Sequence, residues 1–285
     1  MLYCESKHFR QIDRTAFYNC ESSRVPYTPT HVVAVVPLWP LRRFLPFVAL
    51  AIGSMVPDFP LFFPGIVDYA QTHSLVGAFT ACLPIGASLF LLFELFMRRP
   101  LTSLLPDWVQ RRLPSKSGIP VEPRISLHLR YFAGVAFAIV IGAWTHQIWD
   151  AFTHQGRWGT HLVPVLNSEI RIGGSLVPGY KLFQYGSTFF GLPLLTLLAA
   201  VELHRTTPEE RGIATLHQKW KLLAALLILA FPIFVGAFAW STSKNAYQAL
   251  GVTIRHSGAI IMVGLAAYCI LFHAFANGAT IRRDI

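Results

Sequence analysis

An apolar run that begins near Tyr131 ends in the sequence HQIWDAFTH at residues 146–154. His146, Asp150 and His154 are spaced at i, i+4 and i+8, so on an α-helix they share one face. An apolar membrane helix requires every such polar group to be paired or hydrated. A bound metal ion, or the mouth of a polar cavity, would satisfy all three groups at once. The alternative is that these residues only mark the point where the helix leaves the bilayer.

The composition is typical of an integral membrane protein, most of whose surface contacts lipid. Of the 285 residues, 53% are hydrophobic and 13% are charged, and the mean hydropathy is +0.47. The net charge of +10 comes largely from basic residues between apolar runs, a pattern typical of the cytoplasmic loops of membrane proteins. The basic, proline-rich segment 98–130 has only Trp108 as an aromatic residue. A nucleic-acid partner is therefore not expected.

The apolar runs predict an all-α, polytopic helical membrane bundle with about five full spans and an N-terminal half-depth helical hairpin. The full spans are expected at residues 75–97, 131–152, 186–203, 222–240 and 252–276. Residues 1–24 are expected to be a disordered tail, or to precede a true translation start at Val25. Residues 25–285 are expected to form a single integral membrane domain.

The N-terminal hairpin is predicted over residues 31–60. As a helix, the apolar stretch 32–41 would be ~16 Å long, too short to cross a hydrocarbon core of ~30 Å. A turn at residues 42–43 would bring Asp58 back to the face that holds His31. The alternative is one conventional span, with His31 on the opposite side of the membrane.

Alternation of the spans predicts where the candidate ligands meet. If the basic segment 98–130 is cytoplasmic, so is the C-terminus, and the loops 64–74, 153–184 and 241–251 lie outside. Candidate ligands from four separate segments then converge at one extracytoplasmic mouth of the bundle. They are His31, Asp58, His73, His146, Asp150 and His154.

Histidine nitrogens and carboxylate oxygens are the ligands of zinc, and manganese or iron accept the same set. The expected cofactor is therefore a divalent metal, zinc in the first place, with manganese or iron as alternatives. Asp58 and Asp150 are the candidate catalytic residues, because a carboxylate that is not bound to metal can act as general base. Arg255, near the outer end of the last span, either binds an anionic group of the substrate or extends to the membrane interface.

Four motifs, in order, resemble a bacterial membrane family catalogued as domain of unknown function 4184. They are YTPTH at 27–31, GSMVPDF at 53–59, HSLVG at 73–77 and HQIWDAFTH at 146–154. The likeness runs from about Val25 to near the C-terminus. More distantly, the motif order is similar to bacterial inner-membrane proteins described as metal-dependent hydrolases, and the series His, Asp, His, H-x-x-x-D is similar to the zinc-dependent phospholipase C fold.

The distant resemblances imply a ligand set. It comprises His31, Asp58, His73, His146 and Asp150, with His154 as a further candidate. The sequence lacks a clear later H-x-x-x-E pair, so one or two ions are expected rather than three.

These observations predict a membrane-embedded, metal-dependent hydrolase of the bacterial cytoplasmic membrane. Its site would face outward and act on a lipid or lipid-linked phosphoester, so membrane lipid is the expected partner. Two alternatives stay open. One is a transporter or ion-handling protein that uses the same cluster, although no second ionisable cluster marks a route to the cytoplasm. The other is a non-catalytic protein with a structural metal.

Overall fold

The computed structural model describes residues 28–113, 119–120, 125–172, 175–209, 218–243 and 246–276. The predicted N-terminal tail lies outside these residues. Within them the chain is almost entirely helical, and the predicted all-α membrane bundle is confirmed. Five helices are long and apolar enough to cross a membrane: Ala78–Ser103, Ile125–Thr153, Gly179–Arg205, Lys221–Thr242 and His256–Ala274.

The first span is one continuous helix of several parts. It comprises the π-helical turn η4 (Ala78–Cys82), α6 (Leu83–Leu92), the π-helical turn η5 (Phe93–Met97) and α7 (Arg98–Ser103). The helix extends beyond its predicted end at Met97. Arg98 Nη1 donates hydrogen bonds of 2.7 Å to both carboxylate oxygens of Glu94, one turn earlier. This ion pair stabilises the helix where it continues beyond Met97.

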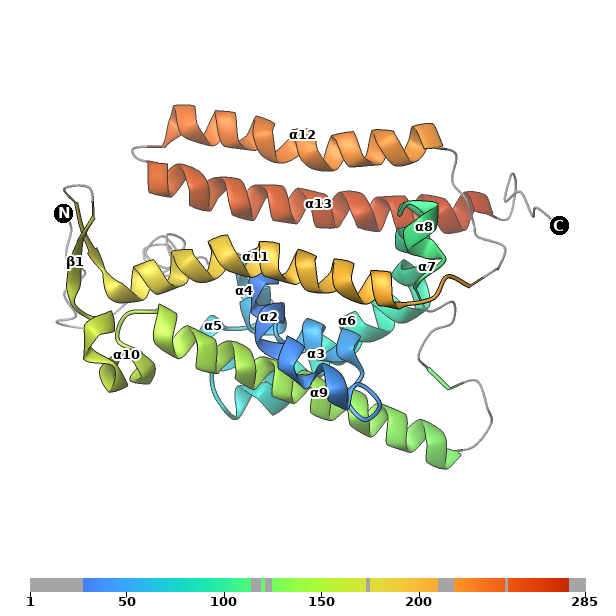
Figure 1. The fold of residues 1–285 in the computed structure, drawn as a ribbon, viewed down its shortest axis with the longest axis horizontal. Coiled ribbons are helices and arrows are strands. Elements are labelled where there is room, and N and C mark those ends of the chain that lie inside the picture. Colours follow the sequence, from blue (N-terminus) through green and yellow to red (C-terminus); the bar gives the residue numbers. More distant parts are fainter. Residues whose placement is uncertain are drawn as a thin grey trace.

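The other spans belong to single long helices. They are α9 (Ile125–Thr153), α11 (Gly179–Arg205), α12 (Gln218–Thr242) and α13 (Ala246–Ala276). In Figure 1, α12 and α13 run side by side, and α13 joins the rest of the bundle through α7 and through α4 (Phe59–Phe62). Phe189, Phe190, Ile233 and Phe234 are exposed on the outer helices. In water such an apolar surface would be unfavourable, so the protein is a membrane protein whose outer face meets lipid.

The predicted N-terminal hairpin is present. Its first arm contains η1 (Thr28–His31), α2 (Val32–Val35) and η2 (Val36–Leu41), and its second contains α3 (Phe47–Gly53), η3 (Val56–Asp58) and α4. Frequent prolines divide both arms into short helical pieces. Thr28 Oγ1 donates a hydrogen bond of 2.8 Å to Asp58 Oδ2, so the far ends of the two arms meet.

The hairpin packs against α9 at backbone contact. A Cβ atom on Gly53 would lie 2.3 Å from Ile139 O, and one on Gly142 would lie 2.5 Å from Leu50 O. Only glycine allows α3 and α9 to approach this closely, as in other membrane helix pairs. Leu50 and Ile139 are fully buried beside this contact, which fixes the position of α3 along α9.

Shorter elements lie at the two ends of the bundle. Near the C-terminal end of α9 lie α10 (Trp158–Leu162), η6 (Pro164–Leu166) and the antiparallel strands β1 (Glu169–Ile172) and β2 (Ser175–Pro178). The segment 153–184 was predicted to be a loop, but the alternation of Ile170 and Ile172 with charged residues gives it a short strand pair. The remaining short helices are α5 (Tyr69–Thr72) and α8 (Asp107–Gln110).

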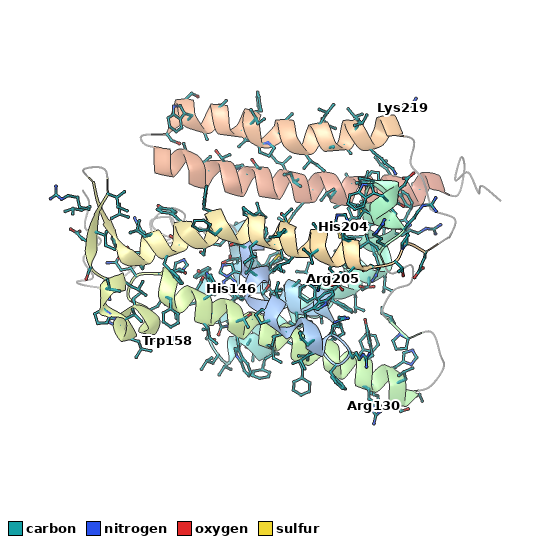
Figure 2. All side chains as sticks on the ribbon, in the orientation of Figure 1. Arg130, His146, Trp158, His204, Arg205 and Lys219 are labelled. Carbon is teal, nitrogen blue, oxygen red and sulfur yellow. The ribbon has the colours of Figure 1, made fainter. Side chains whose placement is uncertain are left out.

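Three labelled basic residues lie in the half of the bundle opposite α10. Figure 2 shows Arg130, Arg205 and Lys219 in this half of the bundle and Trp158 at the other end. His146 lies between them, closer to Trp158.

Candidate metal centre

Four side chains converge in the interior of the bundle. Asp58, His73, His146 and Asp150 each offer one ligand atom, and these atoms all lie within 4.8 Å of one another. Asp58 ends η3, His73 follows α5, and the other two residues lie one turn apart on α9. In the part of the chain that the structure describes, no other group of three or more His, Cys, Asp or Glu residues has this geometry.

The distances within this four-residue group fit ligands that share one ion. His146 Nε2 lies 3.6 Å from Asp58 Oδ1 and 3.4 Å from Asp150 Oδ2. His73 Nε2 lies 3.8 Å and 3.5 Å from the same two oxygens. A direct N–H···O hydrogen bond would measure ~2.7–3.2 Å. Two ligands bound at ~2.0–2.1 Å to a tetrahedral ion lie roughly 3.3–3.4 Å apart, close to the spacing observed.

Several atoms at the centre are buried without a hydrogen-bond partner. They are Nε2 of His31, His73 and His146, and Oδ1 of Asp150. Unpaired polar atoms in an apolar interior are costly and rare, so their convergence needs a physical reason. Imidazole nitrogens and carboxylate oxygens are ligands of divalent cations, and a metal ion would satisfy them. The residues present therefore fit a divalent metal.

Backbone carbonyls orient two of the imidazole rings. His146 Nδ1 lies 2.8 Å from Ser54 O, and His73 Nδ1 lies 3.1 Å from Tyr69 O. In each ring Nδ1–H is therefore the donor, and Nε2 presents its lone pair to the centre, the arrangement usual for metal-binding histidines. The Tyr69 ring stacks on His73 with centroids 3.8 Å apart and restricts its rotation.

The segment that carries His73 is fastened to α9 on both sides. Gln147 Nε2 donates hydrogen bonds of 3.0 Å to Thr72 O and Ser74 O. Thr72 Oγ1 in turn donates a bond of 2.8 Å to Pro57 O, next to Asp58. One hydrogen-bond network thus links three of the elements that supply ligands.

The electrostatic environment keeps two of the imidazoles neutral. Burial, reinforced by the neighbouring His146, holds the pKa of His31 well below its ordinary value. Burial also lowers the pKa of His73, although Asp150 partly opposes the shift. Neutral imidazole is the form that binds metal, so these residues need not lose a proton first at neutral pH.

His31 lies beside the four-residue group rather than in it. Its ring stacks on His146 with centroids 3.9 Å apart, and its Nε2 lies 3.7 Å from Asp150 Oδ1. The ring is 1% exposed. The structure therefore brings His31 to the predicted site, next to Asp150 Oδ1, whereas His73 lies next to Asp150 Oδ2.

His154 also lies beside the group, but its ring nitrogens have other contacts. Nδ1 is 3.5 Å from Asp150 Oδ1 and 3.1 Å from Thr153 Oγ1. Nε2 lies 3.3 Å from the side-chain nitrogen of Gln184 on α11, and accepts a hydrogen bond if that amide donates. Nδ1 then carries the proton and donates to Thr153 Oγ1, so in this arrangement His154 offers no ligand atom.

Two other sequence predictions stay predictions. Residue 255 lies on α13, but the side chain of Arg255 falls outside the described residues, so its predicted substrate contact stays a prediction. The side chains of His31, Asp58, His146 and Asp150 expose only 0–3% of their surface, so the convergence itself is buried. The expected extracytoplasmic mouth stays a prediction.

Several residues that build the centre were missed by sequence reasoning. They are Thr28, Ser54, Tyr69, Gln147 and Gln184. Thr28, Ser54 and Gln147 had a signal, since they lie within the motifs YTPTH at 27–31, GSMVPDF at 53–59 and HQIWDAFTH at 146–154. Tyr69 and Gln184 lie outside these motifs.

The chain belongs to the family described as Domain of unknown function (DUF4184), whose model matches residues 25–274. Comparisons with curated proteins and with solved structures give no match.

Proposed function

We propose that the protein is a membrane-embedded, metal-dependent hydrolase that cleaves a lipid or lipid-linked phosphoester. One observation carries the proposal. Buried imidazole nitrogens and carboxylate oxygens converge without hydrogen-bond partners, at the spacing of ligands around a divalent cation. Zinc is the first candidate for this mixed nitrogen and oxygen set, and manganese or iron would also be accepted.

Four residues would hold the metal: Asp58, His73, His146 and Asp150. A bound divalent cation polarises a phosphoryl oxygen and lowers the pKa of water to near neutrality. Hydrolysis forms a bond from the water oxygen to phosphorus and breaks the bond from phosphorus to the leaving oxygen. The water gives up a proton to a carboxylate, and the leaving oxygen takes one. Asp58 or Asp150 would accept this proton on the carboxylate oxygen that is not bound to the metal.

The depth of the centre supports a lipid-borne substrate. His146 lies two turns before Thr153, where α9 ends, a distance of ~10 Å at the rise of an α-helix. With the end of α9 at the membrane surface, the centre would lie near the level where the hydrocarbon core meets the headgroups. A phosphoester attached to a lipid can reach this depth while its chains stay in the bilayer.

Charge supports an outward-facing site in the bacterial cytoplasmic membrane. Arg130, Arg205 and Lys219 occupy the half of the bundle away from Trp158 (Figure 2). Basic residues favour the cytoplasmic side, so the end with the metal centre would face outward and the C-terminus would be cytoplasmic.

A structural metal is the second candidate, and the burial of the centre favours it. Side chains exposed by only 0–3% describe a closed site, and closed sites with four protein ligands are typical of structural zinc. The two functions differ in one respect that can be measured, because only the hydrolase turns over substrate.

The test combines metal content with turnover. The protein, purified in detergent, would be assayed for bound metal by mass spectrometry and for hydrolysis of a fluorescent phospholipid and of a diphosphate lipid. We expect wild type to bind metal and to hydrolyse one of these substrates. His146→Ala and Asp150→Asn should lose both properties, whereas His161→Ala, at an exposed position on α10, should keep both.

Each other outcome removes part of the proposal. Stoichiometric metal without turnover of either lipid would leave the structural role. A protein that binds no divalent metal after zinc is supplied would refute the metal centre itself.

A further inference from the structure

We infer that the unit connecting α9 to α11, made of α10, η6, β1 and β2, is a membrane-interface element whose apolar side chains lie among the lipid headgroups at that end of the bundle. The inference concerns a surface apart from the candidate metal centre and holds whether or not a metal binds there. It starts from large apolar side chains that a fixed backbone holds on the outside of the protein.

The connecting unit is fixed to the two spans that it joins. A Cβ atom on Gly159 in α10 would lie 2.6 Å from Ala151 O, so α10 packs on α9 at backbone contact. Thr160, the next residue, is fully buried. At the other end, the backbone N–H of Gly179, the first residue of α11, donates a hydrogen bond of 3.0 Å to Ser168 O. Because both ends are held, the unit cannot collapse to bury the side chains on its outer surface.

The outer surface of the connecting unit is rich in large apolar side chains. Among its described residues, Trp158, Leu162, Val165, Ile172 and Leu176 each expose 50–68% of their surface. Single exposed apolar residues are common on proteins, but several on one short unit mark a surface that contacts lipid or another protein.

In α10 the apolar side chains share one face. Trp158 and Leu162 lie one turn apart and are exposed, whereas Gly159 and Thr160 are buried against α9. The Trp158 ring packs edge-on against Phe152, in the last turn of α9, with centroids 5.4 Å apart. Tryptophan is enriched at the level of the lipid headgroups, where one end of its ring is apolar and the other is hydrated. The position of Trp158 beside the end of a span fits this level.

The strand pair separates apolar from charged side chains. Ile170 and Ile172 lie on one face of β1, and Glu169 and Arg171 lie on the other. All four residues are exposed, so the protein covers neither face. Leu176, opposite Arg171 in the register, lies on the charged face. A strand pair with one apolar and one mainly charged face suits the boundary between lipid and water, as an amphipathic helix does.

The position of the connecting unit favours lipid over a protein partner. Because α9 ends at Thr153, α11 begins at Gly179 and both are membrane spans, the unit lies at the membrane surface. In Figure 1 the strand pair runs across the direction of the long helices, and thus along the plane of the membrane. The apolar surface continues that of the spans, where Ile148 on α9 and Phe183 on α11 are exposed near these ends. An apolar face at this level enters the boundary between headgroups and acyl chains by ~5–10 Å.

The test measures which medium surrounds each face of the strand pair. An NBD fluorophore would be attached to Ile172→Cys or, on the opposite face, to Arg171→Cys, in a chain that also carries Cys4→Ser and Cys20→Ser. Cys82 and Cys269 are buried and stay in place, and the chain without an introduced cysteine gives the background. The labelled protein, in nanodiscs of phosphatidylethanolamine and phosphatidylglycerol, would be exposed to two quenchers: a lipid with a nitroxide on its headgroup, and iodide in the water.

The two faces should respond in opposite ways. We expect the nitroxide lipid to quench the label at position 172 at least about twofold more than the label at position 171, and iodide to show the reverse order. Leu162→Cys, on the exposed face of α10, should behave as Ile172→Cys does, and it tests the unit if a label disturbs the strand pair. Phe190→Cys, at an exposed position on α11, is the reference for a lipid-facing side chain that iodide does not reach.

Three outcomes would overturn the inference. If iodide quenches positions 171 and 172 equally and the nitroxide lipid quenches neither, the unit extends into water. If position 172 is shielded from both quenchers, another protein or a second copy of the chain covers the apolar face. If the nitroxide lipid quenches both positions equally, the apolar face does not set the orientation of the unit. None of these outcomes bears on metal binding, so the proposed function is tested separately.

Discussion

Gly142→Ala tests whether the backbone contact between α3 and α9 sets the metal centre. The new Cβ atom would lie 2.5 Å from Leu50 O and 2.7 Å from Ser54 N, whereas ordinary contact begins at 3.4 Å. The difference between 3.4 Å and 2.5 Å means that α3 must retreat by about 0.9 Å. Such overpacking costs typically about 1–3 kcal/mol. The gain of about 1 kcal/mol in helix propensity offsets only part of this.

The displacement of α3 would affect the metal centre through one hydrogen bond, which orients the His146 ring. Ser54 O, on the segment that must move, accepts the bond of 2.8 Å from His146 Nδ1. A retreat of about 0.9 Å breaks this bond and frees the ring, while metal–ligand distances tolerate only about 0.2 Å. Loss of such an orienting partner lowers metal affinity by roughly 10–100-fold. We therefore expect Gly142→Ala to weaken zinc binding within this range, although it removes no ligand.

Gly186→Ala is the matched control. A Cβ atom on Gly186, within α11, would meet nothing within 4 Å, so this variant gains helix propensity without overpacking. Zinc titration and thermal unfolding in detergent would compare both variants with wild type. If Gly142→Ala bound zinc with wild-type affinity and unfolded at the temperature of Gly186→Ala, the helix contact would not position His146.

Three further predictions concern the support of the centre and of the first span. Thr28→Val removes the hydrogen bond to Asp58 Oδ2 and should weaken zinc binding about tenfold in the same titration; unchanged affinity would refute this role. Stripping the metal with EDTA should lower the midpoint of thermal unfolding, and added zinc should restore it. Zinc at 100 times its dissociation constant stabilises the folded state by about 2.7 kcal/mol. An unchanged midpoint would exclude coupling of metal binding to folding. Arg98→Met removes the charged 2.7 Å hydrogen bond to the buried Glu94 carboxylate, so thermal unfolding should show a loss of about 1.5–3 kcal/mol. Arg99→Met, at an exposed position, should cost far less, and equal losses would count against the ion pair.

Local composition was sufficient to predict the membrane architecture. Hydropathy depends on residue type alone, so each of the five spans was located from its apolar run. The N-terminal hairpin could be predicted from the length of the apolar stretch 32–41, because this stretch is too short to cross a bilayer. The ends were less accurate where long-range or charged contacts extend a helix, as Arg98 and Glu94 do in the first span.

The candidate site was predictable where its residues lie one helical turn apart, and less so beyond that. His146 and Asp150 share a face because four residues advance ~400° around an α-helix, only ~40° from a full turn. Eight residues advance ~800°, so His154 lies ~80° out of line with His146 and ~12 Å along the axis. The helix also ends at Thr153. These offsets explain why His154 reaches Asp150 from the side and bonds to Gln184 instead.

The supporting contacts lay beyond sequence reasoning for a different reason. The hydrogen bonds of Gln147 and the carbonyl of Ser54 depend on how separate helices come together. The close approach at Gly53 and Gly142 sets that arrangement, and one sequence shows only that the glycines are there. Side-chain chemistry therefore indicated which residues would gather, while packing decided how each is oriented.

The closure of the centre bears directly on whether the centre is catalytic. Four protein ligands complete the coordination of a tetrahedral zinc ion, and a site closed in this way is suited to holding elements together. Asp58, His73 and Asp150 come from three elements, so a single ion would join the hairpin, the α5 segment and α9. Catalysis needs open positions for water and substrate, whereas the side chains of His31, Asp58, His146 and Asp150 expose only 0–3% of their surface. Hydrolysis of either lipid by wild type, lost in His146→Ala and Asp150→Asn, would thus mean that the surrounding elements move to admit substrate, and bound metal without turnover would leave the structural role.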